Sequence, residues 1–174
     1  LAYATNVSQA GLLQATNSQR STAGAGALTL NSKLSQAAQA KANDMTTRDY
    51  WSHNTPDGEE PWVFIIDTGY SYLKAGENLA YGFATSNDTV TGWMNSPTHK
   101  ANMLDVDYSE VGFGYANSSD FNSAGEETVV VAMYGKPQVL AATPATAPAT
   151  PAPAAPATPA PKEPAPASAT PTPT

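Results

Sequence analysis

Four side chains in this sequence have the chemistry of a site: the two histidines, His53 and His99, and two glutamates, Glu77 and Glu110. Imidazole nitrogens and carboxylate oxygens can hold a divalent cation such as zinc, or they can exchange protons as an acid/base pair. Both kinds of chemistry need the side chains to converge. The turn-rich segments around them are where sites are usually built, although the spacing of the histidines, 46 residues apart, does not by itself show that they meet.

Several common catalytic patterns are absent from the sequence. There is no cysteine, so the chain has no thiol nucleophile, no thiolate metal ligand and no disulfide. There is also no His-Glu-x-x-His run, which is the usual helical pattern of zinc proteases. Ser52 precedes His53 directly, but the sequence has neither the orienting acid nor the oxyanion-hole pattern that a serine hydrolase requires.

Charge and hydropathy exclude further classes. The formal net charge is −7, and the few basic residues are not clustered, which argues against nucleic acid or an anionic membrane as the partner. No stretch is long and apolar enough to span a bilayer. The first residue is Leu rather than Met, so we expect that a signal peptide, an anchor or another leading segment has been removed.

Composition divides the chain into two parts. Residues 1–138 contain all of the tryptophans, tyrosines and histidines, and predict one folded domain. Residues 139–174 are almost entirely Ala, Pro and Thr. Such a segment cannot bury enough apolar surface to form a core, so we expect an extended spacer of the kind that holds a domain away from a cell envelope.

The elements that must position the four side chains are predicted by periodicity and by capping residues. Helices come first along the chain and β-strands last, which indicates an α+β fold with helices covering an antiparallel sheet. The expected helices are 6–20 with a cap at Ser8, 32–47 capped by Asn31 or Ser32, 61–69 with Trp62, Ile65 and Ile66 buried, 85–95 capped by Ser86 or Asn87, and a short turn at 99–104. The expected strands are 77–81, 111–116 and 128–134.

Five motifs in this order resemble the CAP superfamily, the group of cysteine-rich secretory proteins, antigen 5 and plant pathogenesis-related protein 1. The resemblance is greatest to its bacterial, cysteine-free branch of SCP-like extracellular proteins, and it covers roughly residues 5–137. The motifs are His53 with Pro56-Asp57-Gly58, Gly76-Glu77-Asn78-Leu79-Ala80, Trp93-x-x-Ser96-Pro97-x-His99-Lys100-Ala101-Asn102, Glu110-Val111-Gly112-x-Gly114 and the last strand.

The resemblance implies an α-β-α sandwich with a small antiparallel sheet between helical layers, and a cleft in which two histidines and two acidic residues meet. His53, Glu77 and His99 match family positions, and Asn78 follows Glu77 in the same motif. The animal and plant proteins have a further glutamate just after the tryptophan matched by Trp93, where this chain has no acid.

Glu110 is the best candidate for the missing corner, ahead of Asp57 and Asp107. If the site binds metal, we expect His53 and His99 to be the ligands of zinc or another divalent cation, with no obligate cofactor. If the protein is an enzyme, His53, Glu77, His99 and Glu110 are the expected catalytic groups.

Three functions remain open at this point. The leading hypothesis is a secreted or surface-anchored binding module, whose His/Glu cleft holds a small lipid-like or polar ligand or a divalent ion. The second is a metal- or His/Glu-dependent hydrolase that acts on peptides or an envelope polymer. The third is an adhesion or envelope-structural domain. In each case we expect an extracellular or cell-surface location and a monomer, because nothing in the sequence requires an oligomer.

Overall fold

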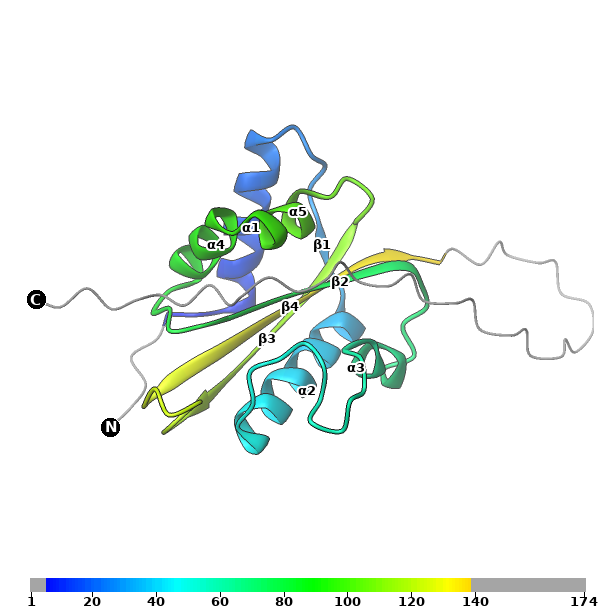
Figure 1. Cartoon of the computed structure of the whole chain (residues 1–174). Coiled ribbons are helices and arrows are strands. Elements are labelled where there is room, and N and C mark those ends of the chain that lie inside the picture. Colours follow the sequence, from blue (N-terminus) through cyan, green and yellow to red (C-terminus); the bar gives the residue numbers. More distant parts are fainter. Residues whose placement is uncertain (1–5, 139–174) are drawn as a thin grey trace, which may run out of the picture.

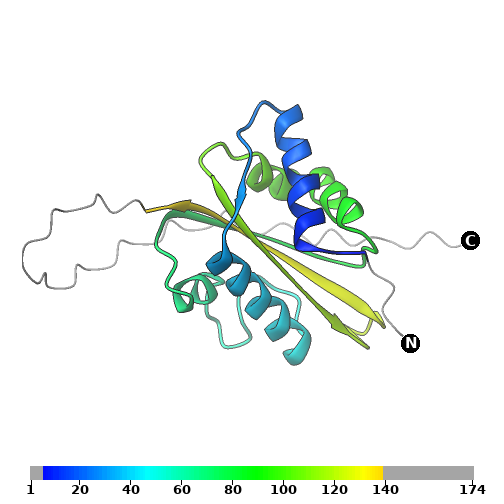
Figure 2. The same cartoon turned by 180° about the vertical axis from the view of Figure 1, so that it is seen from behind.

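The computed structural model describes residues 6–138, which form a four-stranded sheet between two layers of helices (Figures 1 and 2). The α-β-α sandwich expected from the sequence is therefore confirmed. The predicted spacer, residues 139–174, lies outside the described residues. The helices are α1 (Gln9–Thr22), α2 (Ser32–Arg48), α3 (Trp62–Asp67), α4 (Ser86–Asn95) and α5 (Pro97–Leu104). The strands are β1 (Thr29–Leu30), β2 (Tyr72–Tyr81), β3 (Glu110–Ser118) and β4 (Glu127–Pro137).

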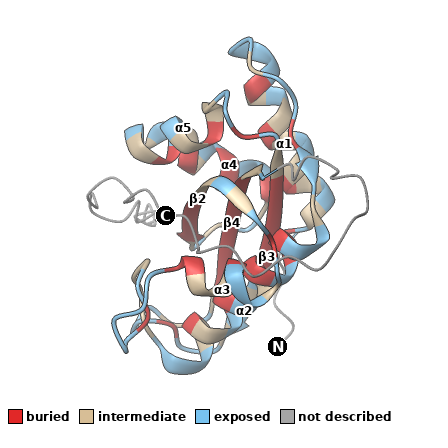
Figure 3. Ribbon diagram, turned by 90° about the vertical axis from the view of Figure 1, so that its right-hand side faces the viewer, coloured by how far each residue is buried: buried red, intermediate tan, exposed pale blue. Residues whose placement is uncertain are grey.

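The strand order in the sheet is β1-β3-β4-β2. The strands β2 and β3 both pair with β4 in antiparallel fashion, while β1 pairs with β3 in parallel. The sheet is therefore mixed rather than purely antiparallel, and the sequence did not predict β1. The apolar run of β4 lies in the middle of the sheet and is buried on both faces (Figure 3). The strand β2, which carries Glu77, lies at one edge.

The two helical layers enclose separate apolar clusters. On one face, α1, α4 and α5 cover a cluster that includes Trp93, Phe113 and Tyr134. On the other face, α2 and α3 cover a cluster that includes Met45 and Ile65. Because β2 is an edge strand, the segments that reach past it from either layer can meet there.

Helix α2 lies directly on β3 because β3 has glycine where the two elements touch. A Cβ atom added at Gly112 would lie 2.0 Å from the carbonyl carbon of Leu34, and one at Gly114 would lie 2.2 Å from the backbone nitrogen of Gln39. Both distances are far shorter than any real contact. The alternating glycines of this strand thus serve the close approach of the helix.

The capping residues explain most of the helix starts. The hydroxyl of Ser8 accepts from the backbone N–H of Gly11, and Asn31 caps α2, which agrees with the sequence prediction. At α4 the cap is Thr85 rather than the expected Ser86 or Asn87. In α3, Trp62 and Ile65 are buried as predicted, but Ile66 is 61% exposed, because this helix of less than two turns buries only one narrow face.

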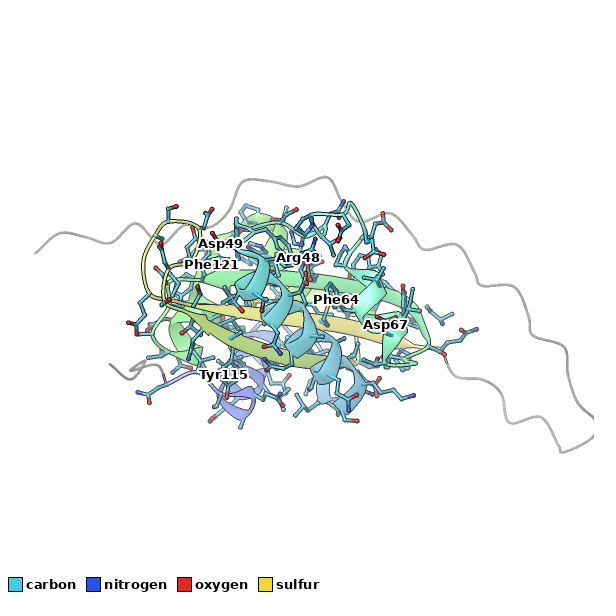
Figure 4. All side chains as sticks on the ribbon, turned by 90° about the horizontal axis from the view of Figure 1, so that it is seen from below. Arg48, Asp49, Phe64, Asp67, Tyr115 and Phe121 are labelled. Atoms are coloured by element: carbon cyan, nitrogen blue, oxygen red, sulfur yellow. The ribbon has the colours of Figure 1, made fainter. Side chains whose placement is uncertain are left out.

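The outer edge of β3 extends beyond the two-residue strand β1, and side-chain amides bind its backbone there. Gln39 of α2 donates to the carbonyl of Tyr115 at 2.8 Å and accepts from the backbone N–H of Tyr115 at 3.3 Å. Gln9 of α1 donates to the carbonyl of Phe113 at 2.8 Å. Figure 4, which looks onto α2, shows Tyr115 on one side of this helix and Phe64 of α3 on the other.

Candidate functional site

His53 and Glu77 are joined by a short hydrogen bond at the β2 edge of the sheet. The Nδ1 atom of His53 lies 2.6 Å from Oε1 of Glu77. Glu77 projects from β2 toward the α2/α3 face, as its cross-strand partner Met133 does, and its side chain is only 2% exposed. His53 belongs to the irregular segment between α2 and α3, and its side chain is 36% exposed. An exposed imidazole is thus oriented by a buried carboxylate.

His99 reaches the same edge from the other helical layer. It lies in α5 and is buried, and its Nδ1 atom has no hydrogen-bond partner among residues 6–138. Burial lowers the pKa of His99 to about 4, and the nearby charge of His53 contributes to this. The ring of His99 is therefore neutral at pH 7. The second oxygen of Glu77, Oε2, is likewise buried without a partner in the described part of the chain.

Two asparagines fasten α5 to β2. Asn78 is fully buried, and its amide donates to the carbonyl of His99 at 3.0 Å and to the hydroxyl of Tyr134 at 3.2 Å. Asn102 donates to the side-chain oxygen of Asn78 at 3.0 Å and to the carbonyl of Glu77 at 3.1 Å. These bonds tie Asn78 to α5 and to β4 and thereby fix the position of His99.

A buried lysine lies behind His53. Lys41 of α2 is fully buried, and its Nζ atom donates to the carbonyls of Ser52 and His53 at 3.0 and 2.6 Å and to the hydroxyl of Tyr50 at 3.2 Å. Burial lowers the pKa of Lys41, whereas the negative charge of Glu77 acts in the opposite direction. The sequence analysis did not identify Lys41 or Asn102 as part of the site.

The structure does not bring Glu110 into this group. Glu110 begins β3, so β4 lies between it and β2, and it is opposite Gly135 whereas Glu77 is opposite Met133. At the usual strand spacing this separates the two glutamates by roughly 12 Å. The carboxylate of Glu110 instead accepts from the hydroxyl of Tyr70 at 2.6 Å. Burial raises the pKa of Tyr70, and this hydrogen bond raises it further.

The two lesser acidic candidates also have partners of their own. Asp57 pairs with Arg48 at 2.7 Å, on the exposed side of the segment that carries His53. Asp107 pairs with Lys74 at 3.2 Å and with Lys136 at 3.0 Å. The described residues thus bring three of the predicted side chains, His53, Glu77 and His99, to one edge.

These residues do not make a good zinc site. Structural and catalytic zinc ions usually have three or four protein ligands. Here one oxygen of Glu77 and Nδ1 of His53 already bind each other, and nowhere in residues 6–138 do three or more His, Asp or Glu side chains form a group that could hold a metal ion. The arrangement is better suited to hydrogen bonding and proton transfer than to holding a resident metal ion.

A surface hollow lies elsewhere on the domain. It has a volume of about 390 Å³ and is formed by the chain after β2 and one side of α4, with Phe83, Asp88, Gly92 and Asn95 in its lining. None of the three site residues belongs to it. The expectation of a cleft at the histidines therefore stays a prediction, and the geometry defines a site at a strand edge.

Comparison of the sequence with known families identifies the family of this chain. The family model "CAP: Cysteine-rich secretory protein family" matches residues 13–134, so this chain belongs to the CAP family. The matched region includes every residue of the site.

Relatives and solved structures agree with this assignment. The chain is 36% identical over 107 residues to YkwD of Bacillus subtilis (strain 168), and 28% identical over 103 residues to the membrane protein YlbC of the same organism. These matches cover 62% and 59% of this chain but only 42% and 30% of the relatives, so the chain spans less than half the length of either. No helix within residues 6–138 is long and apolar enough to cross a membrane.

Two solved structures share the fold. An extracellular protein with an SCP domain from Bacillus anthracis superposes with a TM-score of 0.64 at 21% identity, over 74% of this chain and 40% of that protein. An outer surface protein of Borrelia burgdorferi also gives 0.64, at 23% identity, over 73% of this chain and 90% of that protein. At these identities the likeness shows the fold alone.

Proposed function

We propose that this CAP domain is an extracellular binding module, and that its site is the strand edge where His53, Glu77 and His99 come together. The observation that carries the proposal is the 2.6 Å hydrogen bond between His53 and Glu77, made near the buried imidazole of His99. These groups come from three separate segments of the chain. The extracellular and outer-surface proteins that share the fold support the location.

The energetics of the site support a functional role. A buried polar atom without a hydrogen bond costs about 1–3 kcal/mol. The described part of the chain has four such side-chain atoms, and two of them, Oε2 of Glu77 and Nδ1 of His99, are in this site. A packed apolar edge would avoid that cost, so the polar groups are better explained by what they bind than by stability.

The chemistry of the edge favours a polar ligand over a lipid. The three side chains offer hydrogen-bond donors and acceptors, which are the groups that fix the orientation of a polar ligand. A polar fragment of the cell envelope, such as a soluble glycopeptide, has the matching groups. The proposed binding needs no obligate cofactor, and no step in it passes through a metal ion.

The two histidines make the binding test direct. In a ¹³C–¹H spectrum of the full chain, the imidazole Cε1–H groups give two signals, one for each histidine. We expect soluble muropeptides to shift both signals saturably, and palmitate and zinc chloride to leave them in place. Glu77→Gln should abolish the response, while Glu110→Gln, a matched change two strands away, should preserve it. If muropeptides leave both signals unchanged, the envelope-ligand proposal fails.

A second candidate, hydrolysis, is favoured by the same hydrogen bond for a different reason. An ionised carboxylate can only accept, so Glu77 places the ring proton of His53 on Nδ1 and makes Nε2 the basic nitrogen. A histidine oriented in this way can take a proton from a water molecule that attacks a polar bond. The test is whether the protein releases soluble fragments from purified peptidoglycan or from fluorescent casein. Release by the wild type that is lost in His53→Gln would establish hydrolysis rather than binding alone.

A further inference from the structure

We propose that Lys41 is the positioning residue of this site, and that its buried ammonium group holds the backbone of His53 so that the imidazole meets Glu77. The inference deepens the proposed function and rests on it for its biological meaning. Its structural content can be tested without any ligand.

The hydrogen bonds of Lys41 account for all three of its ammonium protons. Two acceptors are the consecutive carbonyls of Ser52 and His53, and the third is the hydroxyl of Tyr50, which in turn donates to Asp44 at 2.6 Å. An ammonium group has three donors, so this set satisfies it fully. A buried charge is tolerated only when it is paired and hydrogen-bonded in this way.

The segment that Lys41 binds has no regular structure to hold it. Residues 49–61, between α2 and α3, contain neither helix nor strand. The position of such a segment depends on tertiary contacts. The bonds from Lys41 to two successive carbonyls end at His53 itself, so they place the residue that must reach Glu77. The rings of Tyr50 and Phe64, 4.9 and 5.6 Å from Nζ, enclose the ammonium group from the sides.

The charge of Lys41 also serves the buried carboxylate. Glu77 is almost fully buried, and an isolated carboxylate in such surroundings is costly. Lys41 is buried as well, and its positive charge interacts with the negative charge of Glu77, which offsets part of that cost. Lys41 therefore supports both partners of the short hydrogen bond, the imidazole through its backbone and the carboxylate through charge.

A second buried cation provides a matched control. Arg20 of α1 is 1% exposed and donates to the carbonyls of Gly26, Met103, Asp105 and Tyr108. Like Lys41 it binds several backbone carbonyls with a buried charge, but none of its described bonds reaches the segment of His53. Replacing Arg20 should reduce the stability of the fold without specifically breaking the His53–Glu77 bond.

The test is the ring N–H signal of His53 in ¹⁵N-labelled full-length protein. A short Nδ1–H···Oε1 hydrogen bond moves this proton far downfield and slows its exchange. We expect Lys41→Met to lose the signal while the indole N–H of Trp93, which donates to the carbonyl of Leu79, keeps its shift. Lys41→Arg, which retains charge and donors, should restore it, and Arg20→Met should leave it in place.

Several outcomes would overturn the inference. They are a folded Lys41→Met protein with the His53 signal unchanged, a Lys41→Arg protein without it, or equal loss in Arg20→Met. If Lys41→Met does not fold, the lysine ammonium signals of the wild-type protein test the inference instead. A lysine ammonium signal with slow exchange and couplings to the Ser52 and His53 carbonyls supports the proposal, and fast exchange from every lysine refutes it. Failure of muropeptides to bind the wild type, with the Lys41 variants behaving as expected, would count against the proposed function only.

Discussion

The two glutamate-containing motifs of this domain have different roles in the structure. Glu77 on β2 and Glu110 on β3 each accept a hydrogen bond of 2.6 Å from an aromatic side chain, His53 in one case and Tyr70 in the other. The first partner is an imidazole that can change charge near neutral pH, whereas the second is a phenol that stays neutral. The two glutamates differ in this way because β2 and β3 have different positions in the sheet.

Glu77 lies on a strand that is paired on one side only, whereas Glu110 lies where β3 is paired with β1 on one side and β4 on the other. His53 binds Glu77 from the α2/α3 layer, and the carbonyl of His99, in the other layer, accepts from the neighbouring Asn78. On β3, the backbone of α2 fills the space that side chains would need at Gly112 and Gly114, which follow Glu110. The motif of Glu77 thus contributes to the candidate site on β2, whereas the motif of Glu110 forms a surface on β3 against which α2 packs.

The largest expected effect concerns the packing motif. Gly112→Ala would place a methyl group against the backbone of Leu34, which cannot move without displacing α2. We expect a loss of unfolding free energy of about 3 kcal/mol or more. Gly26→Ala, at a position with no neighbour within 4 Å, should change stability little. Urea denaturation of both variants measures the difference, and a Gly112→Ala protein as stable as the wild type would contradict the packing role.

The next effect concerns pH and His99. Its pKa is about 4 in the folded protein and near 6.5 when unfolded, so the unfolded chain binds more protons between these values. The contribution of neutral His99 is fully present above pH 6.5, and is lost as the pH falls toward 4, by up to about 3 kcal/mol. We expect unfolding free energies at pH 7 and 4.5 to differ less in His99→Gln than in the wild type. An equal difference in both proteins would refute the assignment.

A smaller effect separates the two glutamates directly. Glu77→Gln leaves a buried amide between His53 and Lys41 and should reduce stability by about 2 kcal/mol, with loss of the His53 ring signal. Glu110→Gln should keep that signal and cost about 1 kcal/mol, because an amide oxygen can still accept from Tyr70. Thermal melts and the histidine spectrum together measure both. If Glu110→Gln removed the signal, the two regions would not be independent.

The smallest effect tests the partner of Glu110. Tyr70→Phe removes one hydroxyl and should cost about 1 kcal/mol, and the double variant with Glu110→Gln should show that the two changes are coupled. The His53 signal should not change. Additive losses in the double-mutant cycle would mean that the 2.6 Å contact contributes no energy of its own.

Much of the fold follows from local sequence. The caps Ser8 and Asn31 and the apolar run of β4 define elements that need no knowledge of the rest of the chain. The strand β1 could not be predicted, because two residues have no periodicity. Ile66 was wrongly expected to be buried, since a short helix gives too few turns to define its inner face.

The candidate site was predictable only in part, because local motifs indicate which residues take part but not how distant segments pair. Motifs identify His53, Glu77 and His99 as candidates, but strand order, which separates Glu110 from them, depends on pairing between distant segments. Lys41 did carry a usable signal. It continues the stripe of Leu34, Ala38 and Met45 on α2 at helical spacing, and a charged residue on a buried face needs a partner.

The amides of Gln9 and Gln39 on the outer edge of β3 have a consequence for how copies of the domain behave together. An uncovered strand edge is a template onto which a neighbouring chain can add its own strand. Here Phe113 and Tyr115 already bind side chains of the domain itself, so that template is blocked. A neighbouring copy therefore cannot extend the sheet at Phe113 and Tyr115 unless it first displaces these two glutamines.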